Sequence, residues 1–269
     1  MRLKAGCDMT LEATEPCPIV GMLRPASGLA QWLTSESYRF EPHVHPTEYV
    51  DAYGNLCQRF VVPQGTMRIR TEAIVETEDT IAVEPWAPYT PIHMVPDAAL
   101  QYLLQSRYCP SDKMGDRAWQ IVAGCAPGYQ QVEAIRNWIH QNITYQYGVS
   151  TATTDALDTL AQGAGVCRDY SHIGISLCRS LRIPARMVVG YLYQLDPMDL
   201  HAWFEAFVGG RWYTFDATQA QPRGNRIVVA YGRDAADVAF ISNYGGLTTK
   251  SMKVWVDLDD SPDMPDMPG

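Results

Sequence analysis

The chain has 269 residues, of which 46% are hydrophobic and 19% are charged, and its formal net charge is -9. This composition is typical of a globular protein, and the length allows one large domain or two of moderate size. An acidic chain without a run of Lys or Arg gives no electrostatic reason to expect nucleic acid or an anionic membrane as a partner. No apolar run approaches the roughly 20 residues that span a bilayer, and the opening residues lack the apolar core of a secretory signal.

Seven cysteines are scattered along the chain without a C-x-x-C pair. This spacing favours free thiols in a reducing compartment, so we expect a cytoplasmic protein. His43 and His45 form an H-x-H pair with Glu48 nearby, but an isolated pair is a weak signal for metal binding. We therefore expect neither a metal nor another cofactor.

Residues 1–95 lack long helical patterns and carry short β-prone runs between Pro and Gly residues. The runs cover 48–55, 56–65 and 66–76, with Gly54-Asn55 as a turn. The last run alternates, so that one set of side chains shares a face: Met67, Ile69, Thr71, Ala73 and Val75. We predict that 1–95 form a β-rich, sandwich-like N-terminal domain.

Helical patterns begin after Pro96. We predict helices over 97–108, with Asp97 as the cap, over 112–124, and over a short segment capped by Thr154. Residues 129–143 form an amphipathic helix whose apolar face carries Val132, Ile135, Trp138, Ile139 and Ile143. A further helix over 167–181 buries one face, made of Tyr170, Ile173, Gly174, Leu177, Cys178 and Leu181.

Strand patterns follow over 185–195, 200–208, 211–218, 225–231 and 250–258. Helices followed by an antiparallel meander indicate an α+β domain, which we assign to residues 96–258. The acidic, Pro-rich tail at 259–269 is predicted to be disordered.

Cys167 stands at the start of the helix over 167–181, after Gly163 and Gly165. A helix N-terminus and a nearby imidazolium both favour the thiolate, which is the nucleophilic form of cysteine. His172 is about 140° round the helix from Cys167, so it is poorly placed to act as the base and a structural role is favoured.

A hairpin turning at Gly209-Gly210 offers a better base. In a two-residue turn Val208 faces Arg211, which puts Trp203 opposite Asp216. His201, Trp203 and Asp216 then share one face of the hairpin, and His201 and Asp216 are diagonal neighbours within reach of a hydrogen bond. A carboxylate that orients an imidazole, which in turn activates a thiol, is the arrangement used in acyl transfer.

Two stretches, "GAGVCRDYSHIGISLCRSLRIPARMVVGYL" and "DLHAWFEAFVGGRWYTFDAT", resemble the transglutaminase-like superfamily, most closely its bacterial members described as cysteine proteases. The resemblance covers roughly residues 97 to 245, and residues 1–95 resemble more weakly the β-rich domain that precedes the catalytic domain in that group. It implies a papain-like α+β fold, with Cys167 as nucleophile, His201 as base and acid, and Asp216 as the orienting group.

The second oxyanion donor, beside the Cys167 backbone N–H, stays open among Tyr145, Tyr147 and Gln162; Trp203 is a further candidate for substrate contact. Asp169 is expected either to help cap the helix or to bind Arg186, with Arg168 in a supporting role. Residues 231–239, "YGRDAADVA", are expected to be an ordered loop, with a rim of the substrate groove as the alternative.

The leading hypothesis is a cysteine-dependent hydrolase that forms a thioester with a peptide or isopeptide substrate. Transamidation of protein glutamine and a catalytically silent peptide-binding module are the alternatives, and arylamine-type acyl transfer from an acyl-CoA is a weaker one. The sequence decides neither the oligomeric state nor any calcium or proenzyme control.

Overall fold

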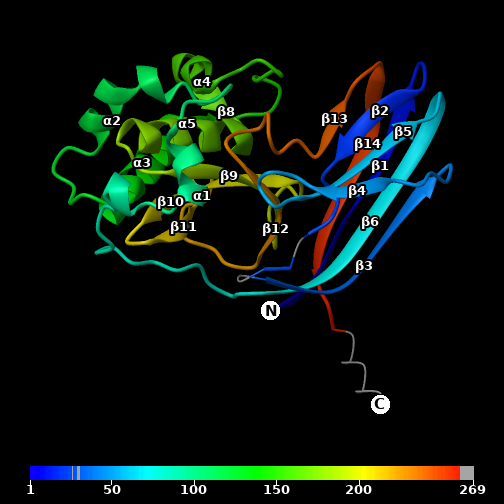
Figure 1. Ribbon diagram of the computed structural model, residues 1–269, viewed down its shortest axis with the longest axis horizontal. Coiled ribbons are helices and arrows are strands. Elements are labelled where there is room, and N and C mark those ends of the chain that lie inside the picture. The colour runs from blue at the N-terminus through cyan, green and yellow to red at the C-terminus, as the bar shows by residue number, and fades with distance from the viewer. Residues whose placement is uncertain (26, 29–30, 261–269) are drawn as a thin grey trace, which may run out of the picture.

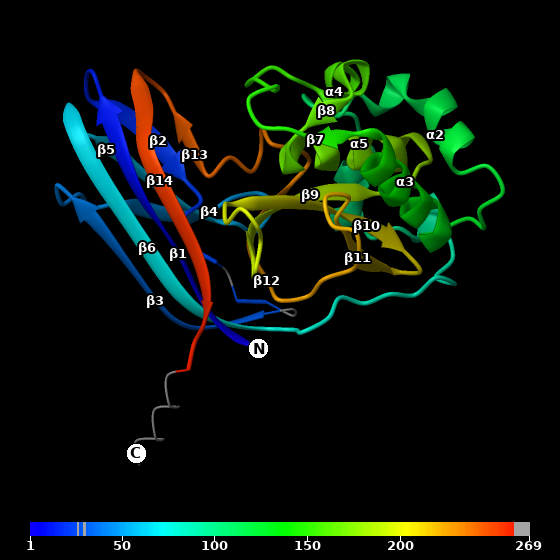
Figure 2. The ribbon, with the colours of Figure 1, turned by 180° about the vertical axis from the view of Figure 1, so that it is seen from behind.

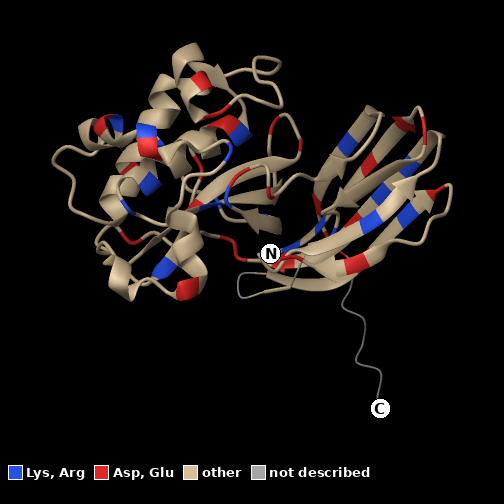
Figure 3. Ribbon diagram, turned by 45° about the horizontal axis from the view of Figure 1, so that its top comes forward, with Lys and Arg blue, Asp and Glu red and all other residues tan. Residues whose placement is uncertain are grey.

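The computed structural model describes residues 1–25, 27–28 and 31–260. Two parts lie side by side in Figure 1, a β-sandwich and a part in which helices cover a smaller sheet. Figure 3 shows acidic and basic residues distributed over both parts. Most of the tail predicted to be disordered, residues 261–269, lies outside the described residues, whereas Asp259 is described and forms an ion pair with Arg2.

The sandwich consists of two antiparallel four-stranded sheets, in the orders β14-β1-β6-β3 and β13-β2-β5-β4. Their strands are β1 (Arg2–Ala13), β2 (Cys17–Gly21), β3 (Gln31–Glu41), β4 (Thr47–Val50), β5 (Leu56–Val62), β6 (Gly65–Thr77), β13 (Ile241–Asn243) and β14 (Leu247–Leu258). The face predicted for β6 is buried at all five positions, Met67, Ile69, Thr71, Ala73 and Val75. Strict alternation exposes one face of the strand and buries the other in the sandwich core.

The C-terminal strands belong to this sandwich. β14 pairs with β1 along nearly its whole length, and β13 pairs with β2. Figure 2 shows the chain returning from the second part to lie along β1. The prediction that 96–258 form one unit therefore needs correction from residue 241 onward, because the pattern of a strand does not indicate which sheet it joins.

The second part contains an antiparallel sheet in the order β11-β10-β9-β12, covered by helices. Its elements are η1 (Ile92–Met94), α1 (Asp97–Leu100), η2 (Gln101–Leu103), η3 (Ser111–Lys113), α2 (Gly115–Ile121), α3 (Tyr129–Asn142), β7 (Thr144–Tyr145), α4 (Ala156–Gln162), β8 (Ala164–Gly165), α5 (Cys167–Ser180), β9 (Ala185–Leu192), β10 (His201–Val208), β11 (Arg211–Phe215) and β12 (Arg226–Gly232). The strands and the helix over 129–142 agree with the sequence prediction.

The helix α5 lies at the centre of this part, against β10 and β9 and surrounded by α2, α3 and α4 (Figure 1). Its predicted apolar face is buried, but the opposite face is buried too, since His172, Ser176 and Arg179 are at most 3% exposed. A Cβ at Gly174 would lie 2.5 Å from a ring carbon of Phe204 on β10. The absence of a side chain at Gly174 therefore lets α5 approach the sheet closely.

Two predicted helix starts differ from the structure. The segment 97–108 is α-helical only to Leu100, and Asp97 does not cap it, because Pro96 is the N-cap and forms no side-chain hydrogen bond. The backbone beyond is held by a tertiary contact, in which Arg179 Nη1 donates to the carbonyl of Leu104. The cap of α4 is Asp155 rather than Thr154, and its carboxylate accepts from two backbone N–H groups.

Two side chains from the sandwich bind to the edge strand β12 of the sheet in the second part. The Gln31 amide donates to the Val228 carbonyl and accepts from the Val228 N–H, and Asn55 forms the same pair of bonds with Tyr231. Both amides are nearly buried. The two amides hydrogen-bond to the outer edge of β12 as a further strand would. The N–H and C=O groups of Val228 and Tyr231 therefore have partners where the two parts meet.

Candidate active site

Cys167 is the first residue of α5 and is partly exposed. The preceding Val166 is the N-cap, and its N–H donates to the Asp169 carboxylate at 2.9 Å. Just before it, β8 pairs in parallel with β7, which sets Tyr145 opposite Gly165. The thiol therefore lies at the positive end of the helix dipole, held in place by a short two-stranded ladder.

The hairpin β10–β11 has the predicted register. Phe204 pairs with Phe215 and Val208 with Arg211, and both turn residues, Gly209 and Gly210, have positive φ. The ladder ends at Phe215, one residue before Asp216. His201 Nε2 and Asp216 Oδ2 nevertheless lie 2.7 Å apart, and both side chains are about 2–3% exposed. The predicted hydrogen bond between these two side chains is confirmed.

The imidazole of His201 lies between Cys167 and the carboxylate of Asp216. Its Nε2 is 2.7 Å from Asp216 Oδ2, and the ring lines the same cavity as Cys167. Burial alone would lower the pKa of His201, but the charge and hydrogen bond of Asp216, together with the Cys167 thiol, raise it above its ordinary value. The imidazolium is therefore favoured beside the sulfur at neutral pH.

Asp216 has a second cationic neighbour that the sequence analysis missed. Arg226 Nη2 lies 2.9 Å from Asp216 Oδ2, and both side chains are almost fully buried. The Thr218 N–H and hydroxyl donate to the other carboxylate oxygen, Oδ1. Burial would raise the pKa of Asp216, but His201 and Arg226 outweigh it and hold the pKa well below the usual range. The sequence marked Arg226 only as the start of a strand, and no local signal ties it to a carboxylate ten residues earlier.

His172 is structural, as its helical phase indicated. Its ring is fully buried and stacked on Tyr108, with centroids 5.0 Å apart. Its Nε2 accepts a hydrogen bond from the Ala235 N–H. Burial lowers the pKa of His172 to about 3, so the ring is neutral at neutral pH.

The four candidates for the oxyanion and for substrate contact lie at different distances from the thiol. Burial, followed by the neighbouring Cys167 thiol, raises the pKa of Tyr145, and the ring of Tyr147 packs edge-on against Tyr145 with centroids 5.5 Å apart. Gln162 instead donates to the Ala164 carbonyl. Trp203 is 1% exposed and lines a hollow on the face of the sheet that turns away from α5. The structure thus brings Tyr145 and Tyr147 to the thiol and leaves Gln162 and Trp203 away from it.

The charged residues next to Cys167 support the helix start. Asp169 helps to cap α5 and pairs with Arg168, which also donates to the Thr151 carbonyl. The alternative that Asp169 binds Arg186 is wrong, because Arg186 pairs with Glu205 at 2.6 Å. Glu205 faces Arg186 across the β9–β10 ladder, a contact that local sequence does not reveal.

The H-x-H pair does not form a larger cluster. The rings of His43 and His45 lie 4.5 Å apart, while Glu48 binds Arg24, Tyr38 and Gln58. Among the residues that the structure describes, no group of three His, Cys, Asp or Glu side chains is arranged to hold a metal ion. Within the same residues, no helix has the length and apolar character needed to cross a membrane.

Comparisons with known proteins found one matching family and two similar proteins that align along most of the chain. Residues 116–217 match the transglutaminase-like superfamily. The crystal structure of a candidate cysteine protease from Cytophaga hutchinsonii is similar, with 33% identity and a TM-score of 0.91 over 100% of this chain and 94% of that one. The uncharacterized protein ML0607 of Mycobacterium leprae (strain TN) is 26% identical over 251 residues, which cover 88% of this chain and 89% of the relative.

Proposed function

The chain belongs to the transglutaminase-like superfamily, and from this premise we propose that it is a cysteine hydrolase acting on peptide or isopeptide bonds. The observation that carries the proposal is that Cys167 and His201 line one cavity, while His201 Nε2 lies 2.7 Å from Asp216 Oδ2. Three elements far apart in the sequence converge on one thiol at a helix N-terminus. Residue types brought together in this order support acyl transfer rather than a purely structural role.

In the proposed mechanism the Cys167 thiolate attacks the carbonyl carbon, and a C–S bond forms. His201 gives its proton to the leaving amine as the C–N bond breaks, which leaves a thioester on Cys167. Neutral His201 then takes a proton from water as the water oxygen attacks the thioester, and the acid leaves while the thiolate returns. Asp216, kept ionised by Arg226, orients the ring throughout and stabilises the imidazolium.

We propose that the Cys167 N–H and the Tyr145 hydroxyl hold the oxyanion. Tyr145 pairs with Gly165, two residues before Cys167, so a substrate oxygen at the thiol would be placed to accept from both groups. Burial, followed by the nearby Cys167 thiol, raises the pKa of Tyr145, so the hydroxyl keeps its proton at neutral pH and is able to donate it. Tyr147 packs on Tyr145 and would hold its ring in place.

The proposal favours hydrolysis over transamidation, following the description of the similar Cytophaga protein as a candidate protease. Peptides or proteins are the expected substrates, and the cytoplasm is the expected compartment. All seven cysteines are free thiols, which suits a reducing environment. A silent peptide-binding module is the second candidate, but the intact Cys–His–Asp geometry argues against it.

The first experiment measures the reactivity of the thiol. Iodoacetamide at pH 6 is expected to modify Cys167 at least about tenfold faster than Cys125, the other partly exposed thiol. Mass spectrometry of tryptic peptides gives both rates, and Cys167→Ala identifies the labelled peptide. Equal rates at the two cysteines would contradict an activated nucleophile.

A second experiment separates the reaction classes. With p-nitrophenyl acetate as acyl donor, we expect an acetyl group on Cys167 that is lost to water and that does not form in His201→Ala. Addition of a primary amine should leave acetate as the main product. Predominant amide formation would favour transamidation instead, and no acylation at all would favour the binding module.

A further inference from the structure

A cavity of about 340 Å³ opens directly beside the catalytic pair, lined at one end by Cys167 and His201. Its walls are mostly apolar side chains from the strand ends of the catalytic sheet and from the segment after β12: Met187, Val189, Leu200, Val229, Val238 and Phe240. Residues 233–239 form an ordered loop after β12, and Ala235, Val238 and Ala239 of this loop line the cavity. A substrate carbonyl at the thiol would have its neighbouring groups next to these walls.

Buried hydrogen bonds hold the loop wall in place. Ala235 N–H donates to His172 on α5, and the Asp234 carboxylate accepts from the backbone N–H groups of Tyr108 and Ala236. Arg179, also on α5, donates to the carbonyl of Arg233. Because these contacts tie the loop to the rigid central helix, the cavity is preformed and binding does not have to order it.

The cavity offers little to a charged group. Besides His201, its charged lining residue is Arg168, whose Nε and Nη2 already donate to Asp169 and to the Thr151 carbonyl. An ionised side chain pushed against Val238 and Phe240 would lose its hydration without gaining a partner. An apolar side chain would lose only contact with water, which is favourable.

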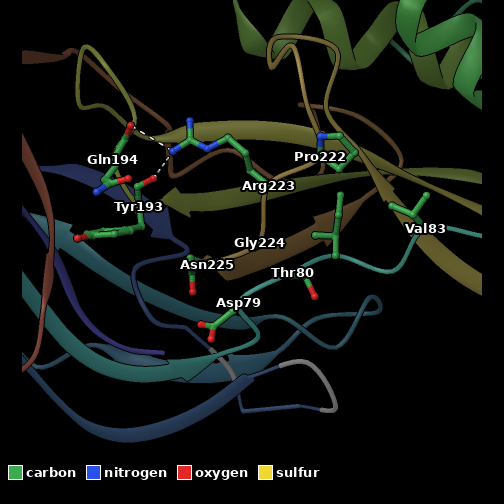
Figure 4. A pocket seen from close by; sticks show the side chains of 10 residues that line it. Asp79, Thr80, Val83, Tyr193, Gln194, Pro222, Arg223, Gly224 and Asn225 are labelled. Atoms are coloured by element: carbon green, nitrogen blue, oxygen red, sulfur yellow. Dashed lines mark hydrogen bonds between the residues drawn. The ribbon is translucent and has the colours of Figure 1, made fainter.

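Another hollow, of about 440 Å³, differs from the apolar cavity because charged side chains line it. It lies at the junction of the two parts, and Figure 4 shows Arg223 donating to the carbonyls of Tyr193 and Gln194 across it. Asp79 on its rim pairs with the amino terminus at 3.0 Å. Its charged groups thus hold the chain together at the junction, and neither Cys167 nor His201 lines it.

We propose that the cavity beside Cys167 binds an uncharged, apolar side chain flanking the attacked carbonyl, so that the substrates are peptides with an aliphatic or aromatic residue at that position. This inference rests on the proposed function, because it assumes that the substrate carbonyl meets the Cys167 thiol. It adds a substrate class: charged residues next to the attacked carbonyl are excluded, and large apolar residues are preferred.

The test compares alkylating reagents that differ only in an apolar chain. Iodoacetamide and N-hexyl-iodoacetamide place the same reactive carbon at Cys167, and each rate is divided by that of the reagent with glutathione. We expect the hexyl reagent to modify Cys167 at least about tenfold faster, the scale of discrimination that apolar pockets achieve.

Two variants alter the cavity in different ways, so that misfolding of one does not decide the result. Ala239→Phe fills the cavity and Leu200→Asp charges its wall; both positions are only partly buried. Each should abolish the advantage of the hexyl reagent while iodoacetamide still modifies Cys167. Ala236→Phe, an exposed position in the same loop that does not line the cavity, should keep the advantage.

Equal corrected rates for the two amides in the unaltered protein would overturn this inference, as would a hexyl advantage that survives both cavity variants. Either result is compatible with fast, selective labelling by iodoacetamide, in which case the proposed function stands. If iodoacetamide modifies Cys167 no faster than Cys125, the proposed function fails first.

Discussion

The first turn of α5 and the interior of the same helix contain similar residues in opposite settings. Cys167 is partly exposed and lines a cavity together with His201, whereas Cys178 is fully buried on the core face. The histidines differ in the same way. Asp216 and the thiol raise the pKa of His201, which reaches Cys167 from β10, while burial outweighs the charge of Asp169 and lowers the pKa of His172, inside α5, to about 3.

The difference shows that the surroundings of a cysteine or histidine, and not its residue type, set its protonation state and reactivity in this protein. Burial raises the pKa of the Cys178 thiol far above its usual value, so it stays protonated and packs as a small apolar group. His172 serves as a neutral acceptor for Ala235 N–H. Reactivity is expected only where a helix end, a solvent-accessible cavity and a charged partner coincide.

The largest expected effect separates the two cysteines. Cys167→Ala should reduce the acylation rate with p-nitrophenyl acetate at least about 10³-fold, because the nucleophile is lost. Cys178→Ala should retain the rate and lose only about 1 kcal/mol of unfolding free energy, since it leaves a small cavity. A comparable loss of rate in a folded Cys178→Ala protein would remove the distinction between the two ends of the helix.

The next effect tests Arg226, the buried cation that pairs with Asp216. Arg226→Met should lower the unfolding free energy by about 3 kcal/mol, because Asp216 keeps a buried charge and loses one of its partners. Urea denaturation measures the change. Arg211→Met is the matched control: this arginine is exposed on β11, at the opposite edge of the same sheet, and its loss should cost less than about 0.5 kcal/mol. If both variants had the same unfolding free energy, the Arg226–Asp216 pair would contribute nothing measurable to stability.

The smallest effect concerns the buried histidine and has a definite sign. Its folded pKa of about 3 lies below the model-peptide value of 6.5, so the unfolded chain binds the proton first and stability falls as pH drops below 6.5. At pH 5 the loss is about 2 kcal/mol, from roughly 1.4 kcal/mol per pH unit. Arg168, Asp169 and Arg179 add smaller, partly opposing effects.

His172→Gln keeps an acceptor for Ala235 N–H but does not titrate. Its unfolding free energy should therefore fall less between pH 7 and pH 5 than that of the unaltered protein, by about 2 kcal/mol. His201 works in the other direction, since its raised pKa gives stability at low pH that disappears as pH rises through the raised value. Identical pH profiles for His172→Gln and the unaltered protein would mean that His172 does not lose its proton on folding.

Much of the second part could be predicted because its signals are local. The apolar spacing in α3 reflects the period of a helix, and Val132, Ile135 and Ile139 are all buried. At Gly209 and Gly210 a two-residue turn needs positive φ at both positions, which glycine adopts without strain. Once that turn was located, the strand period alone predicted that His201 and Asp216 would meet.

Tertiary structure decided the remaining features, because contacts between distant residues leave no periodic pattern in the sequence. The pairing of β14 with β1 joins the two ends of the chain, and the β7–β8 ladder brings Tyr145 to the thiol. Arg226 reaches Asp216 because β12 and β10 flank β9. The sequence by itself determined most of the elements and the meeting of His201 with Asp216, whereas burial and non-local pairing decided the charge on each group and the shape of the cavity beside Cys167.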